Sequence, residues 1–327
     1  MPSAADLTHD TPPSPPPLDT PGPRPHRLED ARAVGVVGCG VVGEQLCHDL
    51  VRTGWPLRVY DTRQDAVVRV ITALATTRVE VATSLPELAL ACHTVFLSLP
   101  TPATAPGRGR GHDLTALHAT LAALRACGYS GVVLIKSTVC PGTVDLLARS
   151  YAPLWLFHAP EFLSSRTAQM DTALPTQPLM LVGAPDGTPA ALTERVRTFL
   201  EGVARGRQRV VAVRARESEA TKLCCNAFYA AKVQLFNEFY HLADQQGISY
   251  AMVRHLMLQQ GWIHPMHTQV PGPDGTLGFG GACLPKDVRA LASWLPPPTA
   301  ADAFPLLRTL GHAAGGTGAA GEGQEER

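Results

Sequence analysis

The chain has 327 residues, which is long enough for two folded domains with sizeable cores. Its 28 basic and 28 acidic side chains cancel, so the charge gives no basic surface of the kind that binds nucleic acid. The apolar runs are only strand-sized and no CxxC pair or HExxH motif occurs, so we expect neither a membrane span nor a metal site. Eight cysteines without paired spacing, and the lack of an apolar signal segment, predict a reducing cytoplasm.

Residues 1–30 are rich in proline and polar side chains, which predicts a disordered leader. From residue 31 to residue 214, short apolar runs alternate with helical patterns, as in the doubly wound parallel sheet of an α/β protein. The expected strands cover residues 34–37, 58–61, 79–81, 94–99, 132–136, 154–158, 179–182 and 210–213.

A glycine-rich turn follows the first expected strand and has the sequence Gly38-Cys39-Gly40-Val41-Val42-Gly43. Gly38 allows a tight turn, Gly40 lets the backbone approach a pyrophosphate, and Gly43 lets the next helix pack closely on the strand. The second strand ends at Asp61, whose carboxylate suits a ribose 2′-hydroxyl and repels a 2′-phosphate. This order of elements predicts a Rossmann-type domain over residues 31–214 that binds NAD rather than NADP.

Residues 215–310 have a helical pattern instead. One long helix is predicted over residues 217–246, a second over 250–260 and a short one over 300–310. We expect a small all-α domain that packs on the nucleotide-binding domain and on a partner subunit in a homodimer, although such a helix could equally be buried within one chain. The Gly, Ala and Glu residues of 311–327 predict a disordered tail.

The segment from Gly278 to Asp287 places Cys283 in a glycine-rich turn directly before a predicted helix. Pro285 suits the first helical position because it lacks an N–H and has a fixed φ. A thiol outside a helix N-terminus, with Lys286 nearby, is favoured as the nucleophilic thiolate. A buried cysteine in a tight turn is the alternative interpretation of this segment.

Three further segments carry polar side chains next to predicted elements. Thr138 lies in a hydroxyl-rich turn after a strand, and Glu161 directly follows another strand. Lys222 and Asn226 are four residues apart, so they share one face of the long helix. Taken singly, each has an ordinary reading: a turn hydroxyl, a helix cap, a solvated charge or a buried amide.

Together, in this order, the Cys283 segment, the Pro160-Glu161-Phe162-Leu163 segment and the others resemble the UDP-glucose/GDP-mannose 6-dehydrogenase family, from about residue 34 to about residue 295. Members of that family oxidise a primary alcohol twice with NAD, through an aldehyde to a carboxylate. The resemblance implies that Cys283 attacks the aldehyde to form a thiohemiacetal and then a thioester. It implies that Lys222 and Asn226 stabilise the oxyanion. The residues implied to position water are Asp287 and Thr138, with Glu161 as an assisting base.

The resemblance also implies which residues bind the two ligands. The expected cofactor contacts are Gly38, Gly40, Val41, Val42, Gly43, Asp61, Pro100, Thr101, Ser137 and Thr138. The expected substrate contacts are Glu161, Phe162, Leu163, Lys222, Asn226, Phe279 and Gly280, with a phosphate held near Phe162 and Leu163 and the sugar near Phe279 and Gly280.

Two departures from the family pattern concern the substrate. The family continues into a third, nucleotide-gripping domain, whereas this sequence runs into three prolines and a low-complexity tail after Leu295. Trp262 also stands where the family usually has an arginine that reaches the neighbouring subunit's substrate. Three hypotheses follow: a dehydrogenase for a smaller alcohol such as a nucleoside, nucleotide or simple sugar phosphate; a nucleotide-sugar dehydrogenase completed by another subunit; or an inactive, truncated, NAD-binding paralogue that regulates a full-length partner.

Overall fold

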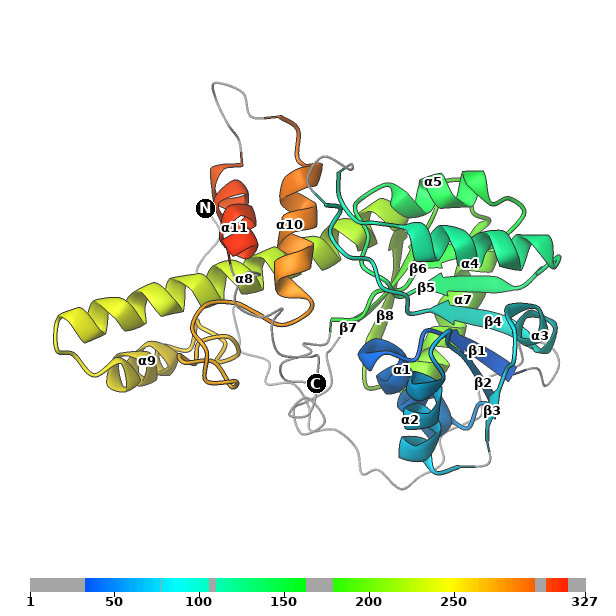
Figure 1. The fold of residues 1–327 in the computed structure, drawn as a ribbon, viewed down its shortest axis with the longest axis horizontal. Helices are drawn as coiled ribbons and strands as arrows, with labels where there is room; N and C mark the ends of the chain where they lie inside the picture. The colour runs from blue at the N-terminus through cyan, green and yellow to red at the C-terminus, as the bar shows by residue number, and fades with distance from the viewer. Residues whose placement is uncertain (1–32, 77, 106–109, 163–178, 298–303, 317–327) are drawn as a thin grey trace, which may run out of the picture.

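The computed structural model describes residues 33–76, 78–105, 110–162, 179–297 and 304–316, and its centre is an eight-stranded sheet (Figure 1). The strand order is β3-β2-β1-β4-β5-β6-β7-β8. The strands are β1 (Ala33–Val37), β2 (Leu57–Tyr60), β3 (Val79–Val81), β4 (Cys92–Leu97), β5 (Val132–Ile135), β6 (Trp155–His158), β7 (Leu179–Ala184) and β8 (Arg209–Arg214).

The predicted doubly wound α/β fold is confirmed, with one difference. All neighbouring strands pair in parallel except β6 and β7, which meet in an antiparallel pair at His158 and Gly183. Antiparallel additions at the side of a parallel sheet are common in large α/β proteins. The strand order reverses between β1 and β4, and open α/β sheets bind ligands at the carboxyl ends of such strands.

Helices cover both faces of the sheet. On one face, α1 (Val41–Thr53), α2 (Gln64–Leu74) and α7 (Ala190–Ala204) share a buried cluster with Val36 and Leu134. On the other, α3 (Leu85–Ala91), α4 (Thr115–Ala126) and α5 (Thr143–Ser150) share a cluster with Val37 and Ile135. Successive strand residues point to opposite faces, so an apolar run without alternation fills both cores at once.

The long helix α8 (Ala215–Gln245) leaves the sheet and extends well beyond it (Figure 1). Its 31 residues span about 45 Å at 1.5 Å per residue. The remaining helices are α9 (Tyr250–Gln259), α10 (Leu284–Trp294) and α11 (Pro305–Gly316). Leu223 and Ala227 of α8 pack against Ala290 and Leu291 of α10. This packing brings the predicted active-site face of α8 against the helix that follows Cys283.

Two predicted helix boundaries were wrong. The helix α10 begins at Leu284, so Pro285 is its second residue rather than its first, where its missing N–H is equally harmless. The helix α11 continues to Gly316, beyond the predicted start of a disordered tail at residue 311. The helix packs closely on α10 at Gly311, where a Cβ would lie 2.4 Å from Cβ of Ala292, so the glycine allows this approach. Among the described residues, no helix combines the length and apolarity that crossing a membrane requires.

Candidate active site

The glycine-rich turn between β1 and α1 has the geometry of a dinucleotide-binding turn. Gly38 has a φ of 96°, and a Cβ there would lie 2.3 Å from the carbonyl oxygen of Ser98. A Cβ on Gly43 would lie 1.8 Å from the carbonyl oxygen of Gly38. A Cβ on Gly40 would meet nothing within 4 Å. The space in front of Gly40 is therefore open, as close approach of a pyrophosphate requires. At Gly38 and Gly43, by contrast, neighbouring backbone atoms occupy the space that a side chain would need.

Asp61 lies directly after β2, beside this turn. Its two carboxylate oxygens accept hydrogen bonds from the backbone N–H of Cys39, at 2.7 Å, and of Arg63, at 2.8 Å. The carboxylate is thereby held against the turn, at the position where an acid contacts a ribose. Val41 and Val42 begin α1, so the predicted cofactor residues of this half lie together.

The two glycines allow a matched prediction. We expect Gly43→Ala to lower the free energy of unfolding by about 1–3 kcal/mol, because the added methyl group overlaps the backbone of Gly38. Gly40→Ala should leave unfolding almost unchanged and weaken NAD binding, since the methyl group enters open space. Urea unfolding and NAD titration of both variants check this. A destabilised Gly40→Ala protein would contradict the assignment of the open space to the ligand.

The second half of the expected cofactor site lies after β4 and β5. The Ser137 hydroxyl donates to the carbonyl of Leu99 at 2.7 Å and accepts from its N–H at 3.0 Å. The Thr101 hydroxyl donates to the carbonyl of Thr138 at 2.8 Å. These bonds join the two loops at the carboxyl ends of adjacent parallel strands, with Pro100 exposed between them. The structure thus brings the predicted residues to one edge of the sheet.

Asp287 is the centre of a buried polar cluster between α8 and α10. Its side chain is 1% exposed. Asn226 donates from Nδ2 to Asp287 Oδ2 at 2.5 Å, while His112 Nε2 lies 3.1 Å from Asp287 Oδ1, which also contacts Nζ of Lys286. Burial alone would raise the pKa of Asp287, but the His112 hydrogen bond and the Lys286 cation outweigh it and lower the pKa to about 2. The carboxylate is therefore ionised at neutral pH.

Lys222 lies one turn before Asn226 on α8 and is 2% exposed. Its Nζ is 3.5 Å from Glu161 Oε1 and 5.4 Å from the centre of the Phe162 ring. The buried Lys136 interacts electrostatically with the same groups. Burial and the Lys222 cation lower its pKa, while the carboxylates of Glu161 and Asp49 raise it. Burial lowers the pKa of Lys136 to about 8. Two lysines and one glutamate thus share this part of the site.

Lys136→Met should stabilise the protein near neutral pH. The pKa of Lys136 is about 8 in the folded protein and 10.5 in the unfolded chain. The buried charge therefore destabilises the folded protein fully below pH 8, and this destabilisation disappears as the pH rises toward 10.5. We expect the free energy of unfolding to rise by up to about 3 kcal/mol at pH 7, because methionine removes the cost of burying a cation. The gain should shrink between pH 8 and pH 10. Chemical unfolding of both proteins across this range is the measurement, and a less stable variant at pH 7 would contradict it.

Cys283 is the N-cap residue of α10 and is partly exposed. Its carbonyl accepts the first helical hydrogen bond, from the N–H of Asp287, at 3.1 Å. The backbone of Cys283 therefore lies one helical turn before Asp287. Phe279 is 3% exposed and packs with Ala230 and Val288, so most of its ring belongs to the core, with Gly280 beside it. Leu163 lies outside the described residues.

Sequence reasoning missed three buried groups at the site. His112 and Cys140 gave no pattern, because their importance depends on neighbours far away in the chain. Glu219 accepts from the N–H groups of Gly142, at 2.5 Å, and Val144, at 2.7 Å, and so caps α5. A signal for Glu219 existed: α5 begins at a glycine that cannot cap it with a side chain, so an outside acceptor was required.

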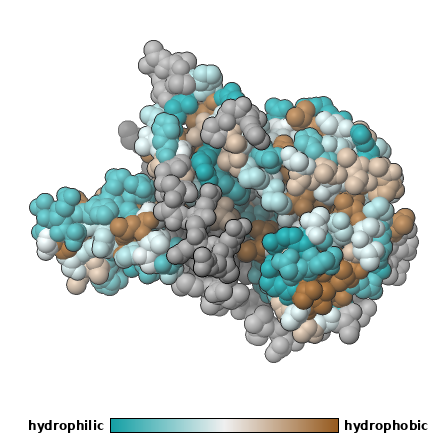
Figure 2. All heavy atoms as spheres, in the orientation of Figure 1, coloured by the Kyte–Doolittle hydropathy of each residue, from teal (hydrophilic) through white to brown (hydrophobic). Residues whose placement is uncertain are grey.

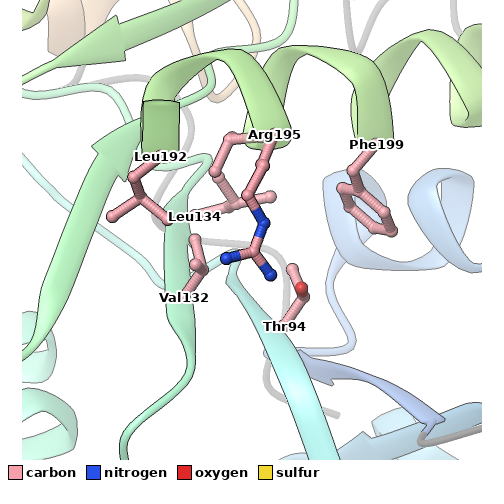
Figure 3. A pocket seen from close by; sticks show the side chains of 7 residues that line it. Thr94, Val132, Leu134, Leu192, Arg195 and Phe199 are labelled. Atoms are coloured by element: carbon pink, nitrogen blue, oxygen red, sulfur yellow. The ribbon is translucent and has the colours of Figure 1, made fainter. Parts of the chain in front are cut away.

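Two cavities of the described part lie away from this site. One is enclosed by α7, β4 and β5, where Arg195 extends between Val132 and Thr94 (Figure 3). Its volume of about 30 Å³ is close to the space that a single water molecule occupies. A second lies near Arg58 and Arg78, at the amino ends of β1 and β2, opposite the ligand edge of the sheet. Within the described ranges, no group of three or more His, Cys, Asp or Glu side chains is placed to hold a metal ion.

Comparison with known proteins agrees with this geometry. Residues 33–113 match the NAD binding domain of 6-phosphogluconate dehydrogenase. Residues 216–303, which include α8, Cys283 and α10, match the central domain of the UDP-glucose/GDP-mannose dehydrogenase family. The helical part of the chain therefore belongs to the central domain of this family. The expected NAD-binding domain and the expected family are thereby confirmed.

Individual members of the family are moderately similar. The chain is 29% identical to the GDP-mannose 6-dehydrogenase of Pseudomonas aeruginosa over 180 residues, covering 52% of this chain and 38% of that protein. It is 31% identical to the UDP-glucose 6-dehydrogenase of the same organism over 245 residues, covering 71% and 51%. The structure of a UDP-glucose dehydrogenase from Pyrobaculum islandicum superposes with a TM-score of 0.67 at 28% identity, covering 81% of this chain and 64% of that one. The chain thus spans about half the length of the curated relatives it matches.

Proposed function

We propose that this protein oxidises a primary alcohol to a carboxylate in two NAD-dependent steps. The observation that carries the proposal is the buried cluster of Asn226 and Asp287 one helical turn from Cys283, with Lys222 one turn further along α8. A partly exposed thiol at a helix N-terminus, a buried lysine and a fixed carboxylate are the groups that aldehyde oxidation through a covalent intermediate needs.

The residues of the turn after β1 and of the loops after β4 and β5 would hold NAD. The open space at Gly40 and the carboxylate of Asp61 fit a dinucleotide. When bound, NAD accepts one hydride in each of the two oxidations. The protein's own groups then bind and orient the substrate carbon at the carboxyl edge of β4 and β5.

The covalent part of the reaction uses Cys283. Its sulfur attacks the aldehyde carbon, a C–S bond forms, and the carbonyl oxygen becomes the oxygen of a thiohemiacetal. Lys222 stabilises the negative charge on this oxygen, with the free N–H of the Asn226 amide as a second donor. Loss of a hydride gives the thioester, and water then breaks the C–S bond to give the carboxylate and the thiol. Asp287 and Thr138 position that water, and Glu161 assists as the base.

We propose that the substrate is the hydroxymethyl group of a sugar nucleotide, or of a nucleoside, nucleotide or related small sugar. The similar proteins of known name act on UDP-glucose, GDP-mannose or UDP-N-acetyl-D-mannosamine. Trp262, which is 93% exposed, stands in the segment after α9 where the family pattern has an arginine. The guanidinium contact to the substrate that the family pattern implies at this position is therefore absent, which favours a substrate that differs from those of the named relatives.

The function is tested with a panel of UDP-glucose, GDP-mannose, UDP-N-acetylhexosamines, nucleosides, nucleoside monophosphates and hexose phosphates. NADH formation and the mass of the product are followed for each compound. Two NADH per molecule of acid would support the four-electron reaction. One NADH per molecule, with an aldehyde as the product, would show that the protein catalyses only the first oxidation. NAD binding without turnover of any compound would favour the regulatory hypothesis instead.

We further propose a homodimer formed through the outer half of α8 and α9. Large apolar side chains are exposed there, and Figure 2 shows hydrophobic residues among hydrophilic ones along this projecting arm. The exposed residues are Leu235, Leu242, Ile248, Met252 and Leu256. Apolar side chains at this density on two helices and the turn between them are typical of a covered surface. Sedimentation of the full chain should give twice the monomer mass, and Leu242→Lys with Met252→Lys should give the monomer.

A further inference from the structure

A short strap of three residues, Arg110, Gly111 and His112, runs along α10. At the end of the helix, the Arg110 guanidinium donates to the carbonyl of Ser293 at 2.7 Å and of Trp294 at 3.2 Å. The N–H of Gly111 donates to the Ser293 hydroxyl at 2.8 Å. His112 contacts the same helix one turn from its start, at Asp287. The strap therefore fixes both ends of the helix that Cys283 begins.

The strap also belongs to the nucleotide-binding domain. His112 pairs with Ala103 in an isolated β-bridge, and the N–H of Asp113 donates to the carbonyl of Pro102 at 2.8 Å. Pro102 directly follows Thr101, whose hydroxyl is bonded to the loop of Thr138. The position of α10 is thus tied to the loops at the carboxyl ends of β4 and β5.

The His112 imidazole is completely buried and has a partner at each nitrogen. Nε2 lies 3.1 Å from Asp287 Oδ1, and Nδ1 lies 3.6 Å from Sγ of Cys140. Asp287 is ionised and can only accept, so Nε2 carries a hydrogen in this contact. Burial raises the pKa of the Cys140 thiol to about 12, so its S–H is present and faces Nδ1 as a donor. Cys140, His112 and Asp287 form one buried hydrogen-bonded chain that ends at Asn226.

We propose that His112 is a positioning residue of the reaction proposed above, and that Cys140 keeps its imidazole in the Nε2–H tautomer. The inference rests on the proposed catalytic role of Asp287. With Oδ1 held by His112 and Oδ2 held by Asn226, the plane of the carboxylate is fixed. A carboxylate with a fixed plane orients water in one direction, and the orienting partner acts through it without touching the reacting atoms.

The kinetic test compares three variants of the full chain. His112→Gln retains an N–H donor near the place of Nε2, His112→Leu has similar size without a donor, and His118→Leu removes an exposed histidine on α4 as the control. For a panel compound that is turned over, we expect His112→Leu to lower kcat by about 10–100-fold with KM for NAD unchanged. His112→Gln should recover most of the loss. Wild-type kcat in His112→Leu, or equal losses in the Leu and Gln variants, would overturn the positioning role.

A second measurement needs no turnover and no folded His112→Leu protein. In protein labelled with ¹⁵N-histidine, two-bond nitrogen–proton correlation spectra distinguish the tautomers, and the signal missing from His112→Gln identifies His112. We expect the Nε2–H tautomer in the wild type and a shift toward mixed tautomers in Cys140→Ala. A proton on Nδ1, or on both nitrogens at neutral pH, would overturn the role of Cys140. The Nε2–H tautomer in a protein that turns over no panel compound would refute the proposed function while supporting this hydrogen-bonded chain.

Discussion

Replacing Cys283 with serine is expected to abolish formation of the carboxylic acid. A hydroxyl at the N-cap of α10 is not ionised at neutral pH, so the thioester path is lost, whereas the first oxidation needs no covalent bond to the protein. Loss of a covalent nucleophile lowers kcat on the order of 10⁶-fold in other enzymes. The measurement is the mass of the product and the number of NADH molecules formed for each substrate molecule consumed.

Cys224→Ser is the matched control for this experiment. Cys224 is an exposed cysteine on α8, so its replacement should leave the acid yield unchanged. An acid still formed at the wild-type rate by the Cys283→Ser protein would refute the covalent path and leave direct oxidation of an aldehyde hydrate as the mechanism. Accumulated aldehyde with one NADH would agree with the role assigned to Cys283.

Lys222→Met is expected to lower kcat by about 10²–10³-fold, which corresponds to about 3–4 kcal/mol of transition-state stabilisation. The lysine is buried beside Glu161 and Phe162, where a cation interacts strongly with a developing oxyanion. Methionine keeps much of the volume and removes the charge. Steady-state kinetics on the active panel compound, with NAD titration as a second readout, measure the effect.

Lys232→Met provides the control for Lys222→Met. Lys232 lies on the same helix, and its Nζ donates to the carbonyl of His264 at 2.5 Å, away from the Asp287 cluster. Its replacement should leave kcat within a factor of about two, because surface contacts of this kind contribute little. Equal kcat values for the two variants would show that Lys222 takes no part in the reaction. Unchanged NAD binding in both variants would show that neither substitution alters the cofactor site.

Most of the fold could be predicted from local patterns. The eight expected strands correspond to β1 to β8, and the strand expected at residues 94–99 differs by two residues from β4. Strands buried on both faces are continuous apolar runs, so their positions are visible without tertiary information. The direction of β7 and the extension of α11 were not visible, because both depend on contacts between distant segments.

The candidate site was predicted in part for the same reason. The glycine turn and the Lys222–Asn226 pair are each set by residues close together in the sequence. Their residue types and spacing are therefore enough to predict a dinucleotide turn and a pair of donors on one helix face. The buried chain through Cys140, His112 and Asp287 joins three segments that are up to 175 residues apart. No sequence period connects such residues.

The sequence by itself determined the residues capable of the chemistry: a dinucleotide turn, an acid after β2, and a cysteine before a helix. These depend on the local backbone and on side-chain type, which neighbouring residues set. The tertiary structure alone decided which of them meet and in which protonation state. Burial and partners fixed the Asp287 carboxylate as an ion, lowered the pKa of Lys136 and placed His112 between Cys140 and Asp287. Hydrogen bonds and dielectric surroundings arise from packing, so they exist only once α10 lies on α8.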